Sequence, residues 1–171
     1  VAVRFLNQKM MRQTLMIFNL SILFITACSK KVNDQVDIDK EKQNVIAVLN
    51  QYKTAVEKLD TTGTAKLYMT ESKIFESGSY EGNYKKYETE HIGPEFSEFL
   101  TFKYYNYEAH VTIDMPYAFA DETYNYEILV KEDSTVAERD GAATSVLKKE
   151  NGEWKIIVSH NSSYKGKGNH N

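Results

Sequence analysis

The clearest indication of the fold lies in residues 151–162, Asn-Gly-Glu-Trp-Lys-Ile-Ile-Val-Ser-His-Asn-Ser. The first two residues form the Asn-Gly pair that favours the two-residue turn of a β-hairpin. The residues on either side of the turn alternate between apolar and polar side chains, as expected of strands. The pattern therefore predicts a hairpin made of a strand over 135–149 and a final strand over 154–162.

Two further strands are predicted before this hairpin. Residues 99–114 and 117–131 show the same alternation. Met115-Pro116 separates them, because proline cannot donate to a central ladder. A charged turn at 132–134 leads into the hairpin. Four consecutive strands joined by short turns predict an antiparallel meander.

Helices are predicted before residue 95. Apolar side chains recur at spacings of three and four over 38–59, which indicates one face of a helix. A second, short helix is expected over 65–69. A third is expected over 84–92, with Asn83 as N-cap and Gly93-Pro94 as its end. Residues 72–75 are expected to form a brief strand, and Gly78 and Gly82 to bracket a turn.

This order of elements, together with the 143–149 and 151–162 motifs, resembles the nuclear transport factor 2-like superfamily, also called SnoaL-like or cystatin-like. The resemblance spans about 39–164. It implies an α+β fold, a cone-shaped roll in which a curved antiparallel sheet wraps around three N-terminal helices, with a pocket at the wide end. The superfamily includes isomerases, dehydratases, hydrolases and transport factors, so the resemblance predicts the fold and not the activity.

Residues 1–27 contain no acidic side chain and place three cations before an apolar run over 15–25. They end in Ile25-Thr26-Ala27, and with Cys28 this sequence resembles the bacterial lipoprotein signal. We therefore expect a signal peptide at 1–27, a lipid on Cys28, a tether at 28–38, the domain at 39–164 and a disordered tail at 165–171. Met10 and Met11 are both possible translation starts. The alternative for Cys28, the only cysteine, is a buried free thiol.

The resemblance to the lipoprotein signal implies that the protein is attached to a membrane by the lipid on Cys28. Because residue 29 is Ser and not Asp, we expect an outer-membrane address if the cell has one. Nucleic acid is not expected, since 21 Lys and Arg against 24 Asp and Glu leave no basic excess. Twelve tyrosines would suit an amphipathic or ring-shaped ligand if several of them line the cavity, although core or sheet-surface positions are the commoner use of such rings.

The candidate pocket residues on the strands follow from parity, whereas His91, on the predicted third helix, is implied only by the family resemblance. His160 shares its parity with Trp154 and is predicted to face inward near the open end of the cone. The candidates expected to converge on one pocket are His160, Trp154, His91, Tyr124 and Tyr126. The alternative for His160 is a hydrogen bond to a carbonyl or a tyrosine with no role in binding.

Three residues are candidates for proton transfer: His160, Glu122 and Asp140. Glu122 shares the parity of Tyr124, so it either faces inward with a raised pKa or lies in water at the rim. The leading hypothesis is a lipid-anchored envelope protein that binds a small molecule, without established catalysis. One alternative is an isomerase, dehydratase or hydrolase that uses His160 with Glu122 or Asp140, and another is a homodimeric interaction module. No motif indicates a cofactor or a metal, and we expect neither.

Overall fold

The computed structural model describes residues 36–166. Its helical elements, in chain order, are α2 (Ile38–Glu57), the 3-10 helix η1 (Thr64–Leu67), α3 (Tyr84–Tyr87), the π-helical turn η2 (Glu88–Ile92) and α4 (Gly93–Glu98). Its strands are β1 (Tyr68–Glu76), β2 (Ser79–Gly82), β3 (Phe99–Asp114), β4 (Tyr117–Val130), β5 (Val136–Glu150) and β6 (Glu153–Lys165). The predicted signal peptide, Cys28 and most of the predicted tether and tail lie outside the described residues.

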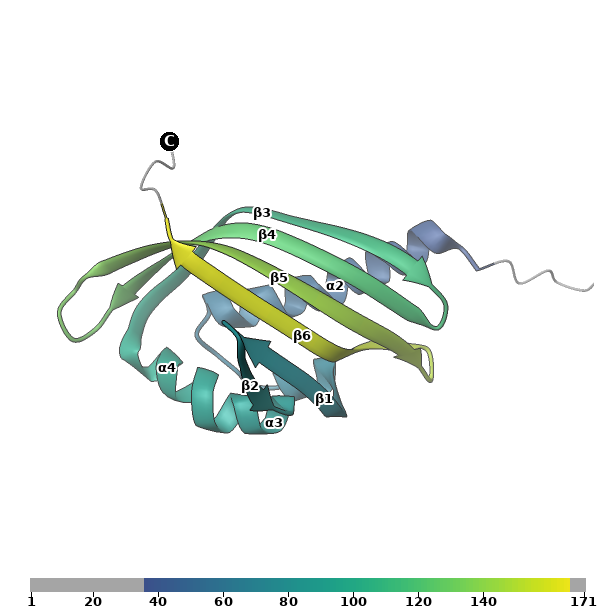
Figure 1. Cartoon of the computed structure of the whole chain (residues 1–171), viewed down its shortest axis with the longest axis horizontal. Helices are drawn as coiled ribbons and strands as arrows, with labels where there is room; N and C mark the ends of the chain where they lie inside the picture. The colour runs from purple at the N-terminus through teal and green to yellow at the C-terminus, as the bar shows by residue number, and fades with distance from the viewer. Residues whose placement is uncertain (1–35, 167–171) are drawn as a thin grey trace, which may run out of the picture. The chain divides into compact units, whose positions relative to one another are not determined.

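The six strands form one curved sheet in the order β2-β1-β6-β5-β4-β3 (Figure 1). The meander from β3 to β6 is antiparallel, as predicted. β1, however, pairs with β6 in parallel, so the sheet is mixed and not wholly antiparallel. The meander could be predicted because each turn joins neighbouring strands, whereas the β1–β6 pair joins residues far apart in the chain.

The prediction of three N-terminal helices is wrong. Residues 64–67 make only one 3-10 turn, and β1 begins immediately after it. The helical segment that starts at Tyr84 continues through η2 and α4 to Glu98, and Gly93-Pro94 does not end it. Pro94 lies in the first turn of α4, where its missing N–H breaks no bond. The described residues thus contain α2, the single 3-10 turn η1 and one further helical segment.

Irregularities in β6 and β3 reverse strand parity near the ends of these strands that matter for the predicted site. In β6, Val158 pairs with Val146 and Ile156 pairs with Leu147, so Ile157 is an extra residue. A similar irregularity in β3 follows Tyr105, where Asn106 has a φ of +48°. An extra residue moves the following side chains to the opposite face. His160 is therefore exposed, and the prediction that it faces inward is wrong.

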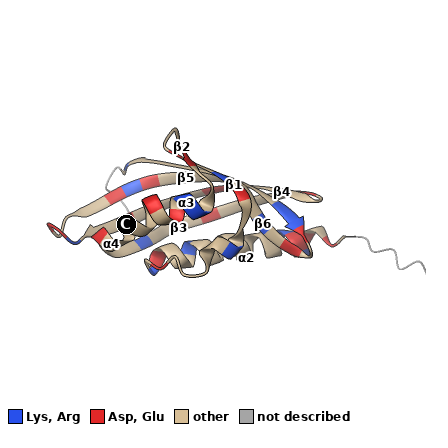
Figure 2. Cartoon of the chain, turned by 90° about the horizontal axis from the view of Figure 1, so that it is seen from below, with Lys and Arg blue, Asp and Glu red and all other residues tan. Residues whose placement is uncertain are grey.

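Helix α2 packs on the inner face of the sheet, with α3 and α4 at the side (Figure 1). Its stripe of Val45, Leu49 and Val56 is buried in one cluster with residues of β5 and β6, including Leu147 and Ile156. Acidic and basic residues are interspersed along the elements (Figure 2). Of the helices within residues 36–166, none has the length and apolar character needed to cross a membrane.

A buried carboxylate joins α2 to the β5–β6 hairpin. Glu41 is only 8% exposed. Its Oε2 accepts a hydrogen bond from Trp154 Nε1 at 2.7 Å, and its Oε1 accepts one from Lys149 Nζ at 2.7 Å. Lys149 and Trp154 are cross-strand partners. The hydrogen bond from Lys149 lowers the pKa of Glu41, so the carboxylate is charged at neutral pH.

We predict that Glu41→Gln lowers the free energy of unfolding by about 2 kcal/mol at neutral pH, because it leaves Lys149 without a charged acceptor. Urea unfolding measures this loss. Since folding lowers the pKa of Glu41 below 4.5, its stabilisation is present above that pH and is lost as the pH falls further. The difference between the two proteins should therefore shrink in acid, and a difference that does not depend on pH would contradict the ionic role.

Candidate functional site

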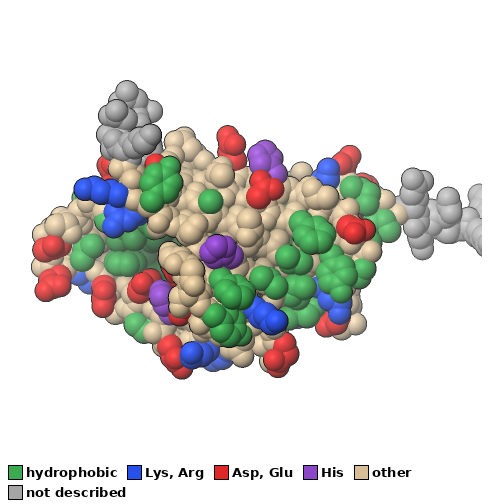
Figure 3. Space-filling model, viewed as in Figure 1, with side chains coloured by type: hydrophobic (Ala, Val, Ile, Leu, Met, Phe, Trp, Pro, Cys, Tyr) green, Lys and Arg blue, Asp and Glu red, His purple; other side chains and the backbone are tan. Residues whose placement is uncertain are grey.

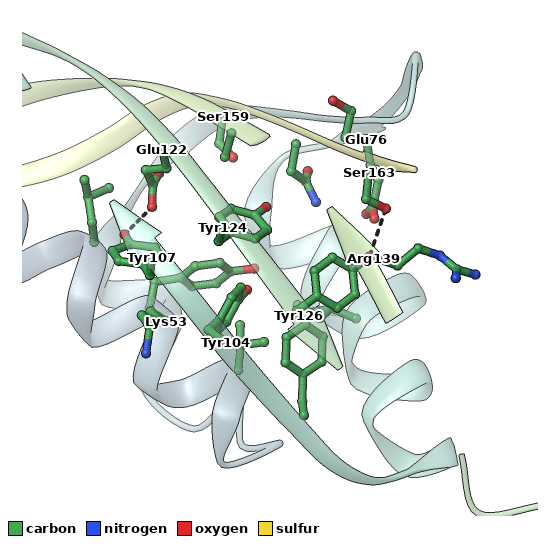
Figure 4. A pocket seen from close by; sticks show the side chains of 18 of the residues that line it. Lys53, Glu76, Tyr104, Tyr107, Glu122, Tyr124, Tyr126, Arg139, Ser159 and Ser163 are labelled. Carbon is green, nitrogen blue, oxygen red and sulfur yellow. Dashed lines mark hydrogen bonds between the residues drawn. The ribbon is translucent and has the colours of Figure 1, made fainter. Parts of the chain in front are cut away.

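A cavity of about 280 Å³ lies between α2, α4 and the inner face of the sheet. Hydrophobic side chains stand in the wall of a hollow at the end of the molecule where β6 finishes, with charged side chains near its edge (Figure 3). Residues of the cavity wall are shown in Figure 4. The cavity is close in size to the sites that hold small organic molecules.

Tyrosines dominate the wall of this cavity. The seven are Tyr52, Tyr68, Tyr87, Tyr104, Tyr107, Tyr124 and Tyr126. Tyr124 is central: its ring lies edge-on to Tyr104, with centroids 5.0 Å apart, and near parallel to Tyr107, with centroids 6.2 Å apart. The hydroxyl of Tyr126 donates to Ser163 Oγ at 2.8 Å (Figure 4). Such rings offer both flat apolar faces and hydroxyl groups to a ligand.

Small residues on β5 make room for these rings. Gly141 of β5 is the cross-strand partner of Tyr124 of β4, and a Cβ on Gly141 would collide with the Tyr124 ring. Ala137 and Ala143 line the same wall. Ala118 and Ala120, the small residues of β4, are buried in the core and do not line the cavity. The ring of Tyr124 therefore depends on glycine at 141 for its position.

Glu122 projects into the cavity from β4. Its Oε2 accepts a hydrogen bond from the Tyr107 hydroxyl at 2.5 Å (Figure 4). Desolvation raises the pKa of Glu122, and the hydrogen bond from Tyr107 opposes that shift only in part. The sequence left open whether Glu122 faces inward or lies in water at the rim, and the structure places it inward. A carboxyl group with a raised pKa beside phenol hydroxyls can accept or return a proton.

A cluster of charges surrounds His91, which lies in η2. Its Nε2 is 3.3 Å from Glu76 Oε2 and 3.3 Å from Glu95 Oε1, and its Nδ1 is 3.5 Å from Glu81 Oε2. The ring of Tyr87 stacks on the imidazole, and its hydroxyl donates to Glu76 at 2.8 Å. Glu76, Glu95 and Tyr87 line the cavity, whereas His91 itself does not. Partial burial raises the pKa of Glu95.

Two cations also lie in the wall, and both already have partners. Lys53 Nζ is 2.8 Å from Glu57 Oε2 and lies over the rings of Tyr104 and Tyr107, at 5.3 and 5.6 Å from their centroids. Arg139 Nη1 donates to the carbonyl of Glu138 at 3.0 Å. Among residues 36–166, no group of three or more His, Cys, Asp or Glu side chains could hold a metal ion.

The five residues predicted to form one pocket do not converge. Tyr124 and Tyr126 line the cavity, and His91 contacts two residues that do. Trp154 is buried in the core with its indole on Glu41. His160 lies on the outer face, where its ring is 6.5 Å from that of Phe75. The bulge at Ile157 is the reason, because it turns Ser159 and Asn161 inward in place of His160.

The proposed proton-transfer pairs are not formed. Glu122 points into the cavity while His160 points away from it. Asp140 is not in the cavity wall, and its Oδ1 accepts a hydrogen bond from Asn125 Nδ2 at 2.6 Å. Parity explains this as well, since the inward residues of β5 are its neighbours Arg139 and Gly141. Of the three catalytic candidates, only Glu122 faces the cavity.

Sequence reasoning missed several residues of the wall. Tyr104 and Tyr107 both face inward because the irregularity at Asn106 lies between them. Asn106 has a positive φ and was a usable signal, since asparagine is a residue that tolerates this conformation. Glu76 was missed because β1 extends past the strand predicted at 72–75. No local pattern shows that β1 pairs with β6.

Comparison with known proteins agrees with this architecture. The profile of the SnoaL-like domain matches residues 45–165. The chain belongs to this family. None of the curated proteins compared with the SnoaL-like chain matches it.

Solved structures show the same fold at low sequence identity. A nuclear transport factor 2-like superfamily protein from Salmonella enterica serovar Typhimurium is 17% identical with a TM-score of 0.67, over 78% of this chain and 99% of that one. A hexachlorocyclohexane dehydrochlorinase from Novosphingobium barchaimii is 10% identical with a TM-score of 0.63, over 77% and 94%. A protein with a cystatin-like fold from Caulobacter vibrioides is 16% identical with a TM-score of 0.58, over 74% and 91%.

We predict that Glu122→Gln stabilises the protein at neutral pH. Folding raises the pKa of Glu122, so its charged form destabilises the folded state above that pKa and has no such effect below the pKa of the unfolded chain. Urea unfolding of both proteins should show a gain in stability that grows as the pH rises from 4.5, the usual pKa of the side chain. Asp121→Asn, on the exposed face of the same strand, is the control and should lack this gain. A loss of stability in Glu122→Gln at neutral pH would contradict the prediction.

Proposed function

We propose that this protein is a lipid-anchored binding protein of the cell envelope, whose SnoaL-like domain holds a small amphipathic or ring-shaped molecule. The main support is the cavity of about 280 Å³ lined by seven tyrosines. A wall that only stabilised the fold would be packed closed, since protein interiors leave few voids larger than a water molecule. Here Gly141, Ala137 and Ala143 keep space open beside large rings.

The charged groups of the wall support a polar contact at one end of the ligand. Within the described residues, the one hydrogen bond found for the Glu122 carboxyl group comes from the Tyr107 hydroxyl, whereas a carboxylate can accept about four. A ligand that brought a donor to this group would recover part of the desolvation cost. The site thus combines apolar ring faces with a few placed polar groups, as small-molecule sites do.

The lipid anchor rests on the sequence Ile25-Thr26-Ala27-Cys28, which lies outside the described residues. Diacylation of Cys28 would supply two chains, and at about 0.8 kcal/mol per buried methylene two chains hold a protein stably on a membrane. The proposed location is the cell envelope, at the outer membrane in a cell that has one.

An enzyme is the second candidate, favoured by the raised pKa of Glu122 beside the Tyr107 hydroxyl. In this reaction class, an isomerase, dehydratase or hydrolase, Glu122 would take a proton from carbon or oxygen and Tyr107 would donate to the oxygen that becomes negative. His160 and Asp140 have no part in it, because both lie outside the cavity. The hexachlorocyclohexane dehydrochlorinase is an example of an enzyme built on this fold.

A homodimer is a further proposal. The outer face of the sheet carries Phe119, Val146 and Val158, which are neighbours across β4, β5 and β6. Phe119 is 48% exposed. Hydrophobic side chains gather on this face in the space-filling view (Figure 3). An exposed apolar group of this kind would suit the pairing of two copies of the chain.

The neutral fluorescent probe N-phenyl-1-naphthylamine tests the binding function. We expect the purified protein to bind it, with a rise in fluorescence, and Tyr107→Leu to weaken binding about tenfold by removing a ring of the wall. Tyr105→Leu is the matched control, because Tyr105 lies on the other side of the bulge and is exposed. Equal affinity in both variants would place the probe outside the cavity and contradict the proposal.

The same assay separates the two candidates. If the protein only binds its ligand, neither the unchanged protein nor Glu122→Gln converts it to a product. An enzyme of the proposed class loses turnover of its substrate in Glu122→Gln while it still binds the neutral probe, since the amide keeps the shape of the carboxyl group.

Cys28→Ala tests the anchor. We expect the variant to leave the membrane fraction or to remain unprocessed, and to lose labelling by a palmitate analogue, because the acylated sulfur is gone. Cell fractionation and metabolic labelling measure both effects. Cys28→Ser is a second variant of closer shape. Continued labelling of either variant by the palmitate analogue would show that the lipid is attached elsewhere and would contradict the assignment to Cys28.

A further inference from the structure

One carboxyl group of the cavity wall, that of Glu122, has no cation facing it in the part of the chain that the structure describes. Three carboxylates line it, from Glu76, Glu95 and Glu122, against the two cations Lys53 and Arg139. Lys53 is already paired with Glu57. Glu76 and Glu95 each lie 3.3 Å from Nε2 of His91. Within residues 36–166, no Lys, Arg or His forms an ion pair with Glu122. A desolvated carboxylate without a charged partner is a site that an incoming cation can complete.

The aromatic rings around Glu122 also favour a cationic ligand. The face of an aromatic ring carries negative charge and attracts cations, and several rings together form the cages that hold quaternary ammonium groups. Tyr107 binds Glu122 through its hydroxyl, and Tyr124 lies edge-on to Tyr104 and near parallel to Tyr107. The chain itself places the ammonium group of Lys53 over the rings of Tyr104 and Tyr107. These two rings therefore accommodate an ammonium group, and one on a ligand would compete with Lys53 for them.

An anion would be disfavoured in the same place. It would approach a carboxylate in a poorly hydrated space, where like charges repel strongly. The two cations of the wall do not offset this repulsion, since Lys53 is paired with Glu57 and Arg139 is the cross-strand partner of Tyr126, four residues along β4 from Glu122. A neutral ring would fit the space but would leave the Glu122 charge without compensation.

We propose that the cavity takes an amphipathic organic cation, an ammonium group attached to an apolar or ring-shaped body, with the ammonium against Glu122 and the rings of Tyr104, Tyr107 and Tyr124. This assignment rests on the proposed binding function and narrows its ligand class. The apolar body lies along the wall toward Ile128, which also lines the cavity.

The experiment compares three compounds of similar size that differ in charge: phenyltrimethylammonium, the neutral tert-butylbenzene and the anion benzoate. Each competes with N-phenyl-1-naphthylamine on the purified protein. We expect the cation to displace the probe at a concentration at least about tenfold below that of tert-butylbenzene, the order expected for a desolvated cation–π and ionic contact, and benzoate not to displace it.

Matched variants identify the residue that recognises the charge. Glu122→Gln should remove the preference for the cation and leave displacement by tert-butylbenzene unchanged, which shows that the cavity is intact. Asp121→Asn removes the same charge from the exposed face of β4 and should keep the preference. If Glu122→Gln does not fold, Tyr104→Leu tests the same point by removing one ring face, and it should also reduce the preference.

The pH dependence gives a second readout. Because the pKa of Glu122 is raised, the affinity for phenyltrimethylammonium should increase as the pH rises and the carboxyl group ionises, while displacement by tert-butylbenzene should not change. Equal potency of the cation and tert-butylbenzene would overturn the cation assignment and leave the binding function standing. Failure of all three compounds and of the probe to bind would overturn both.

Discussion

The carboxylate of Glu41 holds one end of α2 on the β5–β6 hairpin, and the form of the domain depends on this contact. It accepts from Lys149 and from Trp154, which are partners across the two strands. At the usual rise of a helix, α2 spans about 30 Å. At the usual rise of a strand, the longer β3 spans about 50 Å. A helix fixed at the hairpin is too short to cover the strands, and the cavity lies between α2, α4 and the inner face of the sheet.

The chemistry of that cavity follows from how the strands are built. Bulges in β3 and β6 bend the sheet and set which side chains face inward, so that tyrosines of β3 and β4 meet small and hydroxylated residues of β5 and β6. Glu122 is drawn into this environment with one phenol hydroxyl as its partner, at a cost to stability. Such a cost is common where a residue is kept for function. The unpaired charge and the ring faces together favour a cationic ligand.

Prediction from sequence succeeded wherever a local rule was enough. Strands β3, β4 and β5 follow the predicted ranges closely, because turns and alternation mark their ends. It failed at His160 and at Tyr104, each on a strand interrupted by an extra residue, since parity counted along the chain holds only while pairing is regular. The prediction that Gly93-Pro94 ends the helical segment also failed, because Pro94 lies in the first turn of α4, where proline is tolerated.

Local sequence was therefore sufficient for the meander, the amphipathic face of α2 and the inward position of Tyr124 and Tyr126 on β4, whose pairing with β5 is regular. These features follow from periodicity, which is a property of neighbouring residues. Three others emerged only when the chain was folded: β1 pairs in parallel with β6, Ser159 and Asn161 replace His160 in the wall, and Glu41 binds Trp154. Each of these depends on contacts between residues distant in the chain, and such contacts leave no periodic trace in the sequence.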